Sequence, residues 1–262
     1  DHPFLIKSQD SYKWVRAGEI NEKDLVVIQH YEKRFQDPYD DNEIVARLLG
    51  ALETDGTVSK TRNSCEFYVG EFKDACDIID DISSLGFPTP SVKRKISTYD
   101  TCVHKTYCVR PDYSFAQFMI EKGATRGKKT KQTRKIPNWI MEGNKNIQRE
   151  FLSGFQGGDG CKISIHNNGN YDKLHIGRTQ QTAAKNNIES IRQYMKQIQQ
   201  LFTNLGIYTT LHQNDNVLSL SFHCTIESLY KYSEIIGYRY CNEKVRNSNI
   251  NIEYIRTREI MR

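Results

Sequence analysis

The sequence predicts an α+β protein built from two copies of one αββαββα unit, and three observations carry this prediction. A helical stretch that ends in Asp-Gly occurs twice, at residues 48–56 and 152–160. Each copy is followed by two segments of alternating apolar residues and then by a helix with apolar residues at intervals of three and four. Two more alternating segments and a last helix complete each copy. We therefore infer an internal duplication.

The composition is typical of an intracellular globular protein. Of 262 residues, 37% are hydrophobic and 26% charged, and no apolar run is long enough to cross a membrane. The seven cysteines include no Cys-x-x-Cys pair, which indicates a reduced, soluble, cytoplasmic or nuclear protein. A net charge of +5 is too small to predict nucleic-acid binding by itself. The chain starts at Asp1 without an initiator Met, so we expect a fragment.

The chain before the duplication is expected to be a separate β segment. Residues 1–30 read as short strands joined by polar turns. Residues 31–41 are charged, poor in apolar side chains and contain Pro38, which is typical of a linker.

The first copy is expected over residues 42–123. Asn42 suits an N-cap, and Ile44, Leu48 and Leu52 form an apolar stripe on the motif helix. The later elements, in chain order, are strands 57–63 and 66–71, a helix ending at Gly86, strands 92–99 and 104–110, and a helix ending at Gly123.

A basic connector is expected over residues 124–146, followed by the second copy over 147–262. The long helix at 184–205 has the most regular apolar spacing in the chain. The elements of this copy, in order, are a motif helix at 147–159, strands 161–167 and 172–180, the helix at 184–205, strands 207–212 and 217–223, and a helix ending at Gly237.

The two nine-residue stretches resemble the LAGLIDADG motif of homing endonucleases, in the form in which one chain carries both copies. They match it at Leu, Gly and the final Asp-Gly, and the resemblance extends from about Asn42 to the C-terminus. The second copy departs at Gln156 and Gly157, where the family has an apolar residue and an acid. The resemblance implies a pseudo-twofold saddle of antiparallel sheets that binds double-stranded DNA as a monomer.

Asp55 and Asp159 are the predicted metal ligands and catalytic acids. Helices with small residues mid-span can pack closely, so their acidic ends can lie side by side. Two such carboxylates form a hard-oxygen site that suits Mg²⁺. An acid at a helix C-terminus is disfavoured by roughly 0.3–1 kcal/mol. Because this placement occurs twice, a functional role is favoured over the alternative, two helix-end acids without a function. Glu53 is a lesser candidate for the metal shell.

The resemblance also implies one catalytic lysine near each carboxylate. Lys135, followed by Ile136 and Pro137, matches the segment that the family places before its second motif. Lys244 matches the closing segment of the second copy. These lysines would orient water and balance the charge of the transition state.

Two kinds of surface are candidates for DNA binding. Alternating strands can present polar side chains to base edges in the major groove, and the alternative is an ordinary half-solvated sheet. The connector can contact phosphates, and the alternative is a solvated loop. The strand candidates are Lys93, Lys95, Ser97, Tyr99, Lys162, Ser164, His166, Ser219, Ser221 and His223, and the connector candidates are Arg126, Lys128, Lys129 and Lys131.

The N-terminal segment resembles the middle of an intein splicing (Hint) domain, with His2 as the histidine that assists the first acyl shift. The alternative is a terminal surface histidine. The splicing nucleophile and the closing His-Asn pair are missing from this chain, so self-splicing by it is excluded.

The sequence therefore predicts a site-specific, Mg²⁺-dependent DNA endonuclease, the homing component of an intein. The two copies carry different residues on the outward faces of their strands. The nearest counterparts in the second copy to the outward residues of the first are Tyr208, Thr210 and His212. We expect a non-palindromic target for this reason. The alternatives are an RNA maturase and an inactive DNA-binding remnant.

Overall fold

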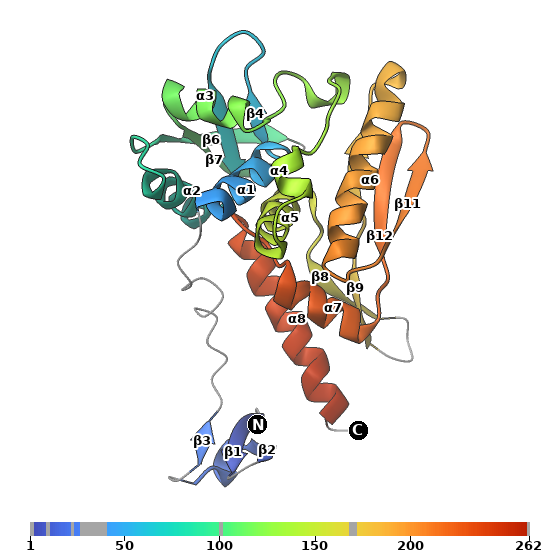
Figure 1. Cartoon of the computed structure of the whole chain (residues 1–262). Coiled ribbons are helices and arrows are strands. Elements are labelled where there is room, and N and C mark those ends of the chain that lie inside the picture. Colours follow the sequence, from blue (N-terminus) through green and yellow to red (C-terminus); the bar gives the residue numbers. More distant parts are fainter. Residues whose placement is uncertain are drawn as a thin grey trace. The chain divides into compact units, whose positions relative to one another are not determined.

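A computed structural model describes residues 3–8, 11–21, 24–26, 41–99, 102–167 and 172–260 (Figure 1). The chain divides into two compact units, one of residues 40–255 and one of residues 1–39 with 256–262. Within the described ranges, no helix is long and apolar enough to cross a membrane.

The first half of the larger unit follows the predicted order of elements. Its four strands form one antiparallel sheet in the order β4-β5-β7-β6. Helix α2 packs on β5 and β7 because Ala75, Ile78 and Ile82 form a buried stripe along it. The elements are α1 (Asp41–Leu52), β4 (Gly56–Val58), β5 (Cys65–Val69), α2 (Phe72–Ser84), β6 (Ser91–Tyr99), β7 (Cys102–Arg110) and α3 (Tyr113–Glu121).

The connector contains two short helical turns, η3 (Lys129–Lys131) and α4 (Asn138–Met141). It leads into the second half. The elements there are α5 (Lys145–Asp159), β8 (Ile163–Asn167), β9 (Asp172–Ile176), β10 (Thr179–Thr182), η4 (Lys185–Asn187), α6 (Ile188–Asn204), β11 (Thr209–Asn214), β12 (Val217–Phe222), α7 (Ile226–Ile235) and α8 (Asn242–Ile260).

The strands of the second half form two antiparallel sheets, β8-β9 and β10-β12-β11. Helix α6 lies along β11 and β12 (Figure 1). Its apolar face meets the sheet through Phe202, whose ring lies edge-on to Phe222 with centroids 5.2 Å apart. The predicted α+β class with antiparallel sheets is therefore confirmed.

Two features of the second half differ from the prediction. The single strand expected at 172–180 is divided into β9 and β10, because the chain breaks its pairing with β8 and joins β12 instead. Helix α8 was not predicted. Its buried positions Ser248, Ile252 and Ile255 have helical spacing, but only two of them are apolar, so the periodic signal is weak.

Helices α1 and α5 pack against each other at backbone distance, and glycines make this possible. A Cβ on Gly50 would lie 2.7 Å from the backbone nitrogen of Phe155, and a Cβ on Gly154 would overlap the carbonyl oxygen of Arg47. Gly157 has the same constraint, because a Cβ there would overlap the carbonyl oxygen of Arg239. Glycine at position 157, where the sequence departs from the motif, therefore lets the segment between α7 and α8 approach α5 closely.

We expect Gly154→Ala to destabilise the fold by about 1–3 kcal/mol, because the added methyl group meets a backbone carbonyl that cannot rotate away. Chemical denaturation measures this change. Gly70→Ala is the matched control, since Gly70 has no atom within 4 Å of an added Cβ. Equal stability of the two variants would mean that α1 and α5 are less closely packed than described.

The smaller unit contains a three-stranded antiparallel sheet in the order β2-β1-β3. Its strands are β1 (Pro3–Ser8), β2 (Ser11–Arg16) and β3 (Leu25–Val26), with a 3₁₀ turn, η1 (Ala17–Glu19), after β2. Ile6 is fully buried there. His2 lies outside the described residues, so its predicted role in an intein splicing domain stays a prediction.

Candidate active site

Asp55 and Asp159 lie at the same end of the packed helix pair. Asp159 is the last residue of α5, and Asp55 follows the end of α1 by three residues. The helices run in the same direction, because Gly50 faces Phe155 and, one turn later, Thr54 faces Gly158. A Cβ on Gly158 would lie 3.2 Å from Oδ2 of Asp55. The fold thus brings the two predicted acids into one site.

The two carboxylates share an environment that disfavours their charge. Burial, and then the neighbouring charge of Asp55, raise the pKa of Asp159 to about 6. Asp55 is exposed as a residue, but partial burial of its carboxylate raises its pKa, while the charges of Lys244 and Lys129 oppose this shift. Two crowded carboxylates of raised pKa gain free energy when a cation binds between them.

Two lysines donate hydrogen bonds to the carbonyl groups at the two motif ends. Nζ of Lys129 lies 2.6 Å from the carbonyl oxygens of both Thr54 and Gly56. Nζ of Lys244 lies 2.6 Å from the carbonyl oxygens of Gly157 and Gly158 and 3.2 Å from that of Gln156. Each lysine therefore places a positive charge at the negative end of one motif helix.

The two lysines differ in the hydrogen bonds that they have left to offer. An ammonium group has three donors. Lys244 uses three on carbonyl oxygens, whereas Lys129 uses two among the residues that the structure describes. Burial lowers the pKa of Lys129 to about 8, which the charges of Glu53, Asp159 and Asp55 oppose. Lys129 is thus a cation of lowered pKa, near the charges of Asp55 and Asp159, with one donor that has no partner among the described residues.

The lysine beside the carbonyl groups at the first motif end is Lys129, and the expected Lys135 lies elsewhere. Lys135 is exposed, while the preceding residue Arg134 and the following residue Ile136 are buried. The connector binds the core through these neighbours, since Ile136 N donates to Gln197 at 2.9 Å. The side chain of Lys135 therefore points outward. The lysine that bonds the first motif end, as Lys244 bonds the second, is therefore Lys129 and not the expected Lys135, whose catalytic role stays a prediction.

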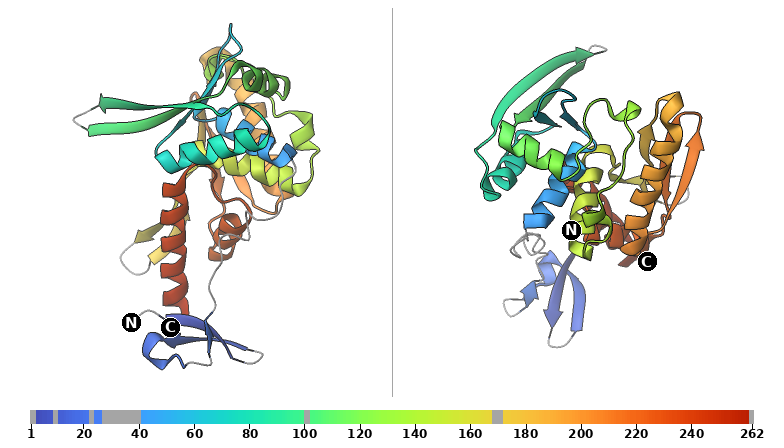
Figure 2. Two further views of the ribbon diagram at one scale, coloured as in Figure 1. Left: turned by 90° about the vertical axis from the view of Figure 1, so that its left-hand side faces the viewer. Right: turned by 45° about the horizontal axis from the view of Figure 1, so that its top comes forward.

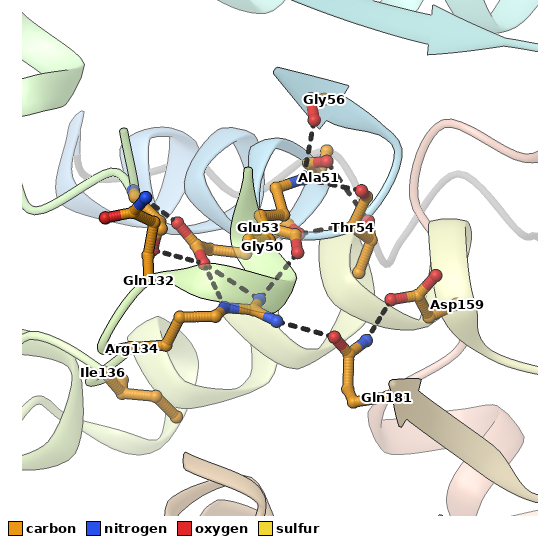
Figure 3. Close-up of polar contacts among 12 residues, drawn as sticks. Gly50, Ala51, Glu53, Thr54, Gly56, Gln132, Arg134, Ile136, Asp159 and Gln181 are labelled. Carbon is orange, nitrogen blue, oxygen red and sulfur yellow. Dashed lines mark hydrogen bonds and ion pairs between the residues drawn. The ribbon is translucent and has the colours of Figure 1, made fainter. Parts of the chain in front are cut away.

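A chain of polar side chains, buried at Glu53 and Arg134 and half-buried at Gln181 and Asp159, joins the first motif to Asp159 (Figure 3). Arg134 contacts Glu53 through Nη2 at 2.9 Å and donates through Nη1 to Oε1 of Gln181 at 2.6 Å. The amide nitrogen of Gln181 donates to Oδ2 of Asp159. Glu53 also accepts from the backbone and hydroxyl of Thr125 at 2.7 and 2.9 Å. The carboxylate of Glu53 therefore binds Arg134 and Thr125. It is not available for the metal shell, for which it was a lesser candidate.

Only part of the basic connector is open to solvent. Lys128 and Lys131 are exposed, as expected for phosphate contacts. Arg126 is half-buried and donates to the carbonyl oxygen of Ser59 at 3.2 Å, and Lys129 points inward as described. The predicted DNA-binding roles of Arg126 and Lys129 therefore need correction, because these cations bind backbone carbonyls of the first half.

The first sheet presents basic and aromatic groups on the face away from its helices. Lys93 and Lys95 are exposed, and Nζ of Lys95 lies 3.3 Å from the hydroxyl of Tyr68. Their strands extend beyond α2 (Figure 2). The side chains of Ser97 and Tyr99 lie outside the described residues.

The same face carries a second polar pair that was not predicted. Nε of Arg110 lies 2.6 Å from Glu66 on the neighbouring strand. Register places Glu66 and Arg110 on the face of Tyr68 and Lys93, because these residues alternate with Phe67 and Val109 of the core. Alternation in residues 65–69 and 106–110 was the available signal.

The second half presents fewer serine hydroxyls than predicted. Ser219 is 5% exposed, and Ser221 has a buried hydroxyl oxygen with no partner among the described residues. Both lie on β12, the central strand, where β10 and β11 flank them. Ser219 and Ser221 therefore cannot serve as open base contacts. His223 is exposed, as are Tyr208, Thr210 and His212, the counterparts expected on the neighbouring strand.

The β8-β9 pair forms a further polar row. Lys162 and His166 are exposed and Ser164 is half-buried, in line with the expected alternation. Register adds two exposed residues, since His175 pairs with Ser164 and Lys173 pairs with His166. Lys173 and His175 were not predicted as DNA contacts, although residues 172–176 also alternate.

The donors around Asp55 and Asp159 fit a divalent ion that keeps water ligands. Gln181 uses one oxygen of Asp159, which leaves Oδ1 for an ion. Among the described residues, no cluster of three or more Asp, Glu, His or Cys side chains exists. Water, carbonyl or phosphate oxygens must therefore complete the shell. Mg²⁺ accepts such a shell, whereas structural zinc requires more protein ligands.

No protein-family model matches the chain. Among curated proteins, it is 26% identical to the tRNA-splicing ligase RtcB of Methanopyrus kandleri, over 99% of this chain and 30% of that protein. It is 25% identical to the DNA-directed RNA polymerase subunit Rpo1N of Methanocaldococcus jannaschii, over 95% of this chain and 19% of that protein. The chain thus spans between about a fifth and a third of the length of these relatives.

Among solved structures, the N-terminal LAGLIDADG domain of DUF199/WhiA matches with a TM-score of 0.51 and 13% identity, over 85% of this chain and 98% of that one. This similarity supports the LAGLIDADG fold. The structure of I-DmoI in complex with DNA and Mn matches with a TM-score of 0.44 and 18% identity, over 76% of this chain and 98% of that one.

Proposed function

We propose that the chain is a site-specific DNA endonuclease that uses Mg²⁺ or another divalent cation, and that it is the homing component of an intein. The observation that carries this proposal is the pair Asp55 and Asp159 at one end of two packed helices, with Lys129 and Lys244 bound beside them. The polar faces of the sheets supply surfaces for a duplex.

In this proposal, Asp55 and Asp159 would hold the metal, which when bound would supply a more acidic water and offset negative charge on the phosphate. The chain's own groups do the rest. Lys129 offers a free donor and a pKa of about 8, near the working pH, which suits a group that gives a proton to the departing oxygen. Lys244, saturated with carbonyl partners, holds the end of α5 in place.

The intein assignment is supported by the kinds of protein that contain similar segments. A ligase and an RNA polymerase subunit have unrelated activities, yet each contains a segment similar to nearly all of this chain. Neither activity explains a segment common to both. A mobile inserted element explains why the same segment occurs in both. The β segment before α1 lies where a remnant of a splicing domain is expected.

Cleavage of a randomised plasmid library, with Mg²⁺ or with EDTA, tests the proposed activity. We expect linear product only with the metal, and a recovered target that is not palindromic. The first half presents Lys93, Lys95 and Arg110 where the second presents Thr210 and His212, so the half-sites meet different side chains. The monomer proposed here gives a cleavage rate linear in protein concentration.

Three results would contradict this proposal. Specific binding without cleavage would mean an inactive DNA-binding remnant, and metal-dependent promotion of RNA splicing would mean a maturase. A perfectly palindromic target with a rate that rises as the square of protein concentration would indicate a homodimer.

The corrected connector surface makes a prediction about salt. Replacing Lys128 and Lys131 with Gln removes two exposed cations and should weaken binding to all duplexes alike. Each lost phosphate contact should flatten the slope of log affinity against log salt concentration by about 0.9. Fluorescence anisotropy at several salt concentrations measures the slope. An unchanged slope in the double variant would remove the connector from the DNA-binding surface.

A further inference from the structure

We propose that Arg134 and Gln181 are positioning residues, through which the connector sets the orientation of the Asp159 carboxylate toward the metal. This inference rests on the proposed function of the same site. In this role, neither residue contacts DNA or the reacting atoms.

Arg134 is held from several sides before it reaches Gln181. Its side chain is buried, and its Nε and Nη2 lie 3.2 and 2.9 Å from Oε2 of Glu53. Nη2 also donates to the backbone carbonyl of Glu53 at 2.7 Å, and the guanidinium lies 4.0 Å from the ring centroid of Tyr194. The backbone nitrogen of Arg134 donates to Ser190 at 3.2 Å. A planar guanidinium with this many contacts has one orientation.

That orientation determines which way the Gln181 amide faces. A guanidinium has donors and no acceptor, so the atom of Gln181 that faces Nη1 must be its oxygen, at 2.6 Å. The amide nitrogen then faces Oδ2 of Asp159 and donates to it, as Figure 3 shows. Without Arg134 the amide is free to turn its oxygen toward the carboxylate, which would repel it.

The two oxygens of Asp159 therefore have different roles. Oδ2 is fixed by Gln181, and Oδ1 is left for the cation. Asp55 has no hydrogen-bond partner among the described residues, so the two carboxylates are held to different degrees. Groups that fix a ligand in this way commonly change metal affinity about 10–100-fold when they are removed.

The experiment compares Gln181→Met, Arg134→Lys and the double variant with the parent. Gln181→Met removes the amide without changing charge, and Arg134→Lys keeps the positive charge beside Glu53 but loses the fork. Gln200→Met is the matched control, because Gln200 is exposed on α6 and bonds only Asn204 among the described residues. Mn²⁺ affinity is measured by calorimetry without DNA, and the Mn²⁺ concentration for half-maximal cleavage is measured with the target.

We expect both single variants to weaken Mn²⁺ binding about 10-fold, with unchanged DNA affinity. Gln181→Met should keep the parental unfolding temperature, whereas Arg134→Lys should lower it, because it loses buried hydrogen bonds to Glu53. The double variant should match Gln181→Met alone, because Arg134 acts through Gln181. If Arg134→Lys does not fold, Gln181→Met still tests whether the amide bound to Asp159 affects Mn²⁺ affinity. Parent-like Mn²⁺ affinity in Gln181→Met, or additive losses in the double variant, would overturn the inference. A parent that neither binds Mn²⁺ nor cuts DNA would instead overturn the proposed function.

Discussion

Asp55→Asn and Asp159→Asn should each abolish double-strand cleavage while leaving DNA binding intact. Each change removes one negative charge from the candidate metal site and keeps nearly the same shape. Metal catalysis contributes several kcal/mol, so a loss of about 10³-fold or more in cleavage rate is expected. Binding should stay equal or improve, because the lost carboxylates lie in the site where phosphates approach. A plasmid-cleavage time course and anisotropy with labelled target DNA measure the two effects.

Asp215→Asn is the matched control, since Asp215 is exposed in the turn between β11 and β12. It should cleave like the parent. If either Asp55→Asn or Asp159→Asn cleaved at the parental rate, the two-carboxylate site would not be the catalytic centre. Loss of binding together with cleavage would point to a folding defect, which thermal unfolding would reveal.

Lys129→Met should lower cleavage about 10²-fold or more, while Lys135→Met should have little effect. The first removes a half-buried ammonium that lies 2.6 Å from the carbonyl oxygens of Thr54 and Gly56, and the second removes an exposed charge. General acid or base catalysis commonly contributes about 10²-fold to 10⁴-fold. Single-turnover cleavage of both variants separates the two lysines directly, and the opposite ranking would restore Lys135.

The pH dependence gives a second test of Lys129. Its lowered pKa means that the ammonium form is lost as pH rises through about 8, so cleavage should fall above that pH. Lys129→Arg keeps the charge at all working pH values, and any activity that it retains should show no such fall. An unchanged alkaline limb in Lys129→Arg would assign that limb to another group.

The paired acids were predictable because their signal is local. Asp55 and Asp159 each come at the same distance after a helix glycine, Gly50 or Gly154, and close packing at these glycines is enough to bring the helix ends together. The helix at 188–204 was predictable for a similar reason, since its buried residues repeat with helical spacing. Local periodicity survives folding because each helix buries one face.

The partners of these acids were less predictable because the path of the connector decides them. Residues 125–136 have no periodic pattern, so nothing in the sequence shows that Lys129 and Arg134 turn inward while Lys131 and Lys135 turn outward. Gln181 was missed because its strand begins after a break that the alternating pattern does not mark. Ser219 was overestimated because alternation shows which face a residue occupies, but not how far its neighbours cover it.

The buried connector also limits how this protein can be recombined. In a two-part protein with a passive tether, either part can be exchanged for another as a module. Here Thr125, Lys129 and Arg134 come from the tether and bind the first motif, while Arg134 also reaches Gln181 of the second half. An engineered chimera that replaces residues 125–136 with a flexible linker would lose two cations, Lys129 and Arg134, from the candidate site. The segment between the halves should therefore be inherited with both of them.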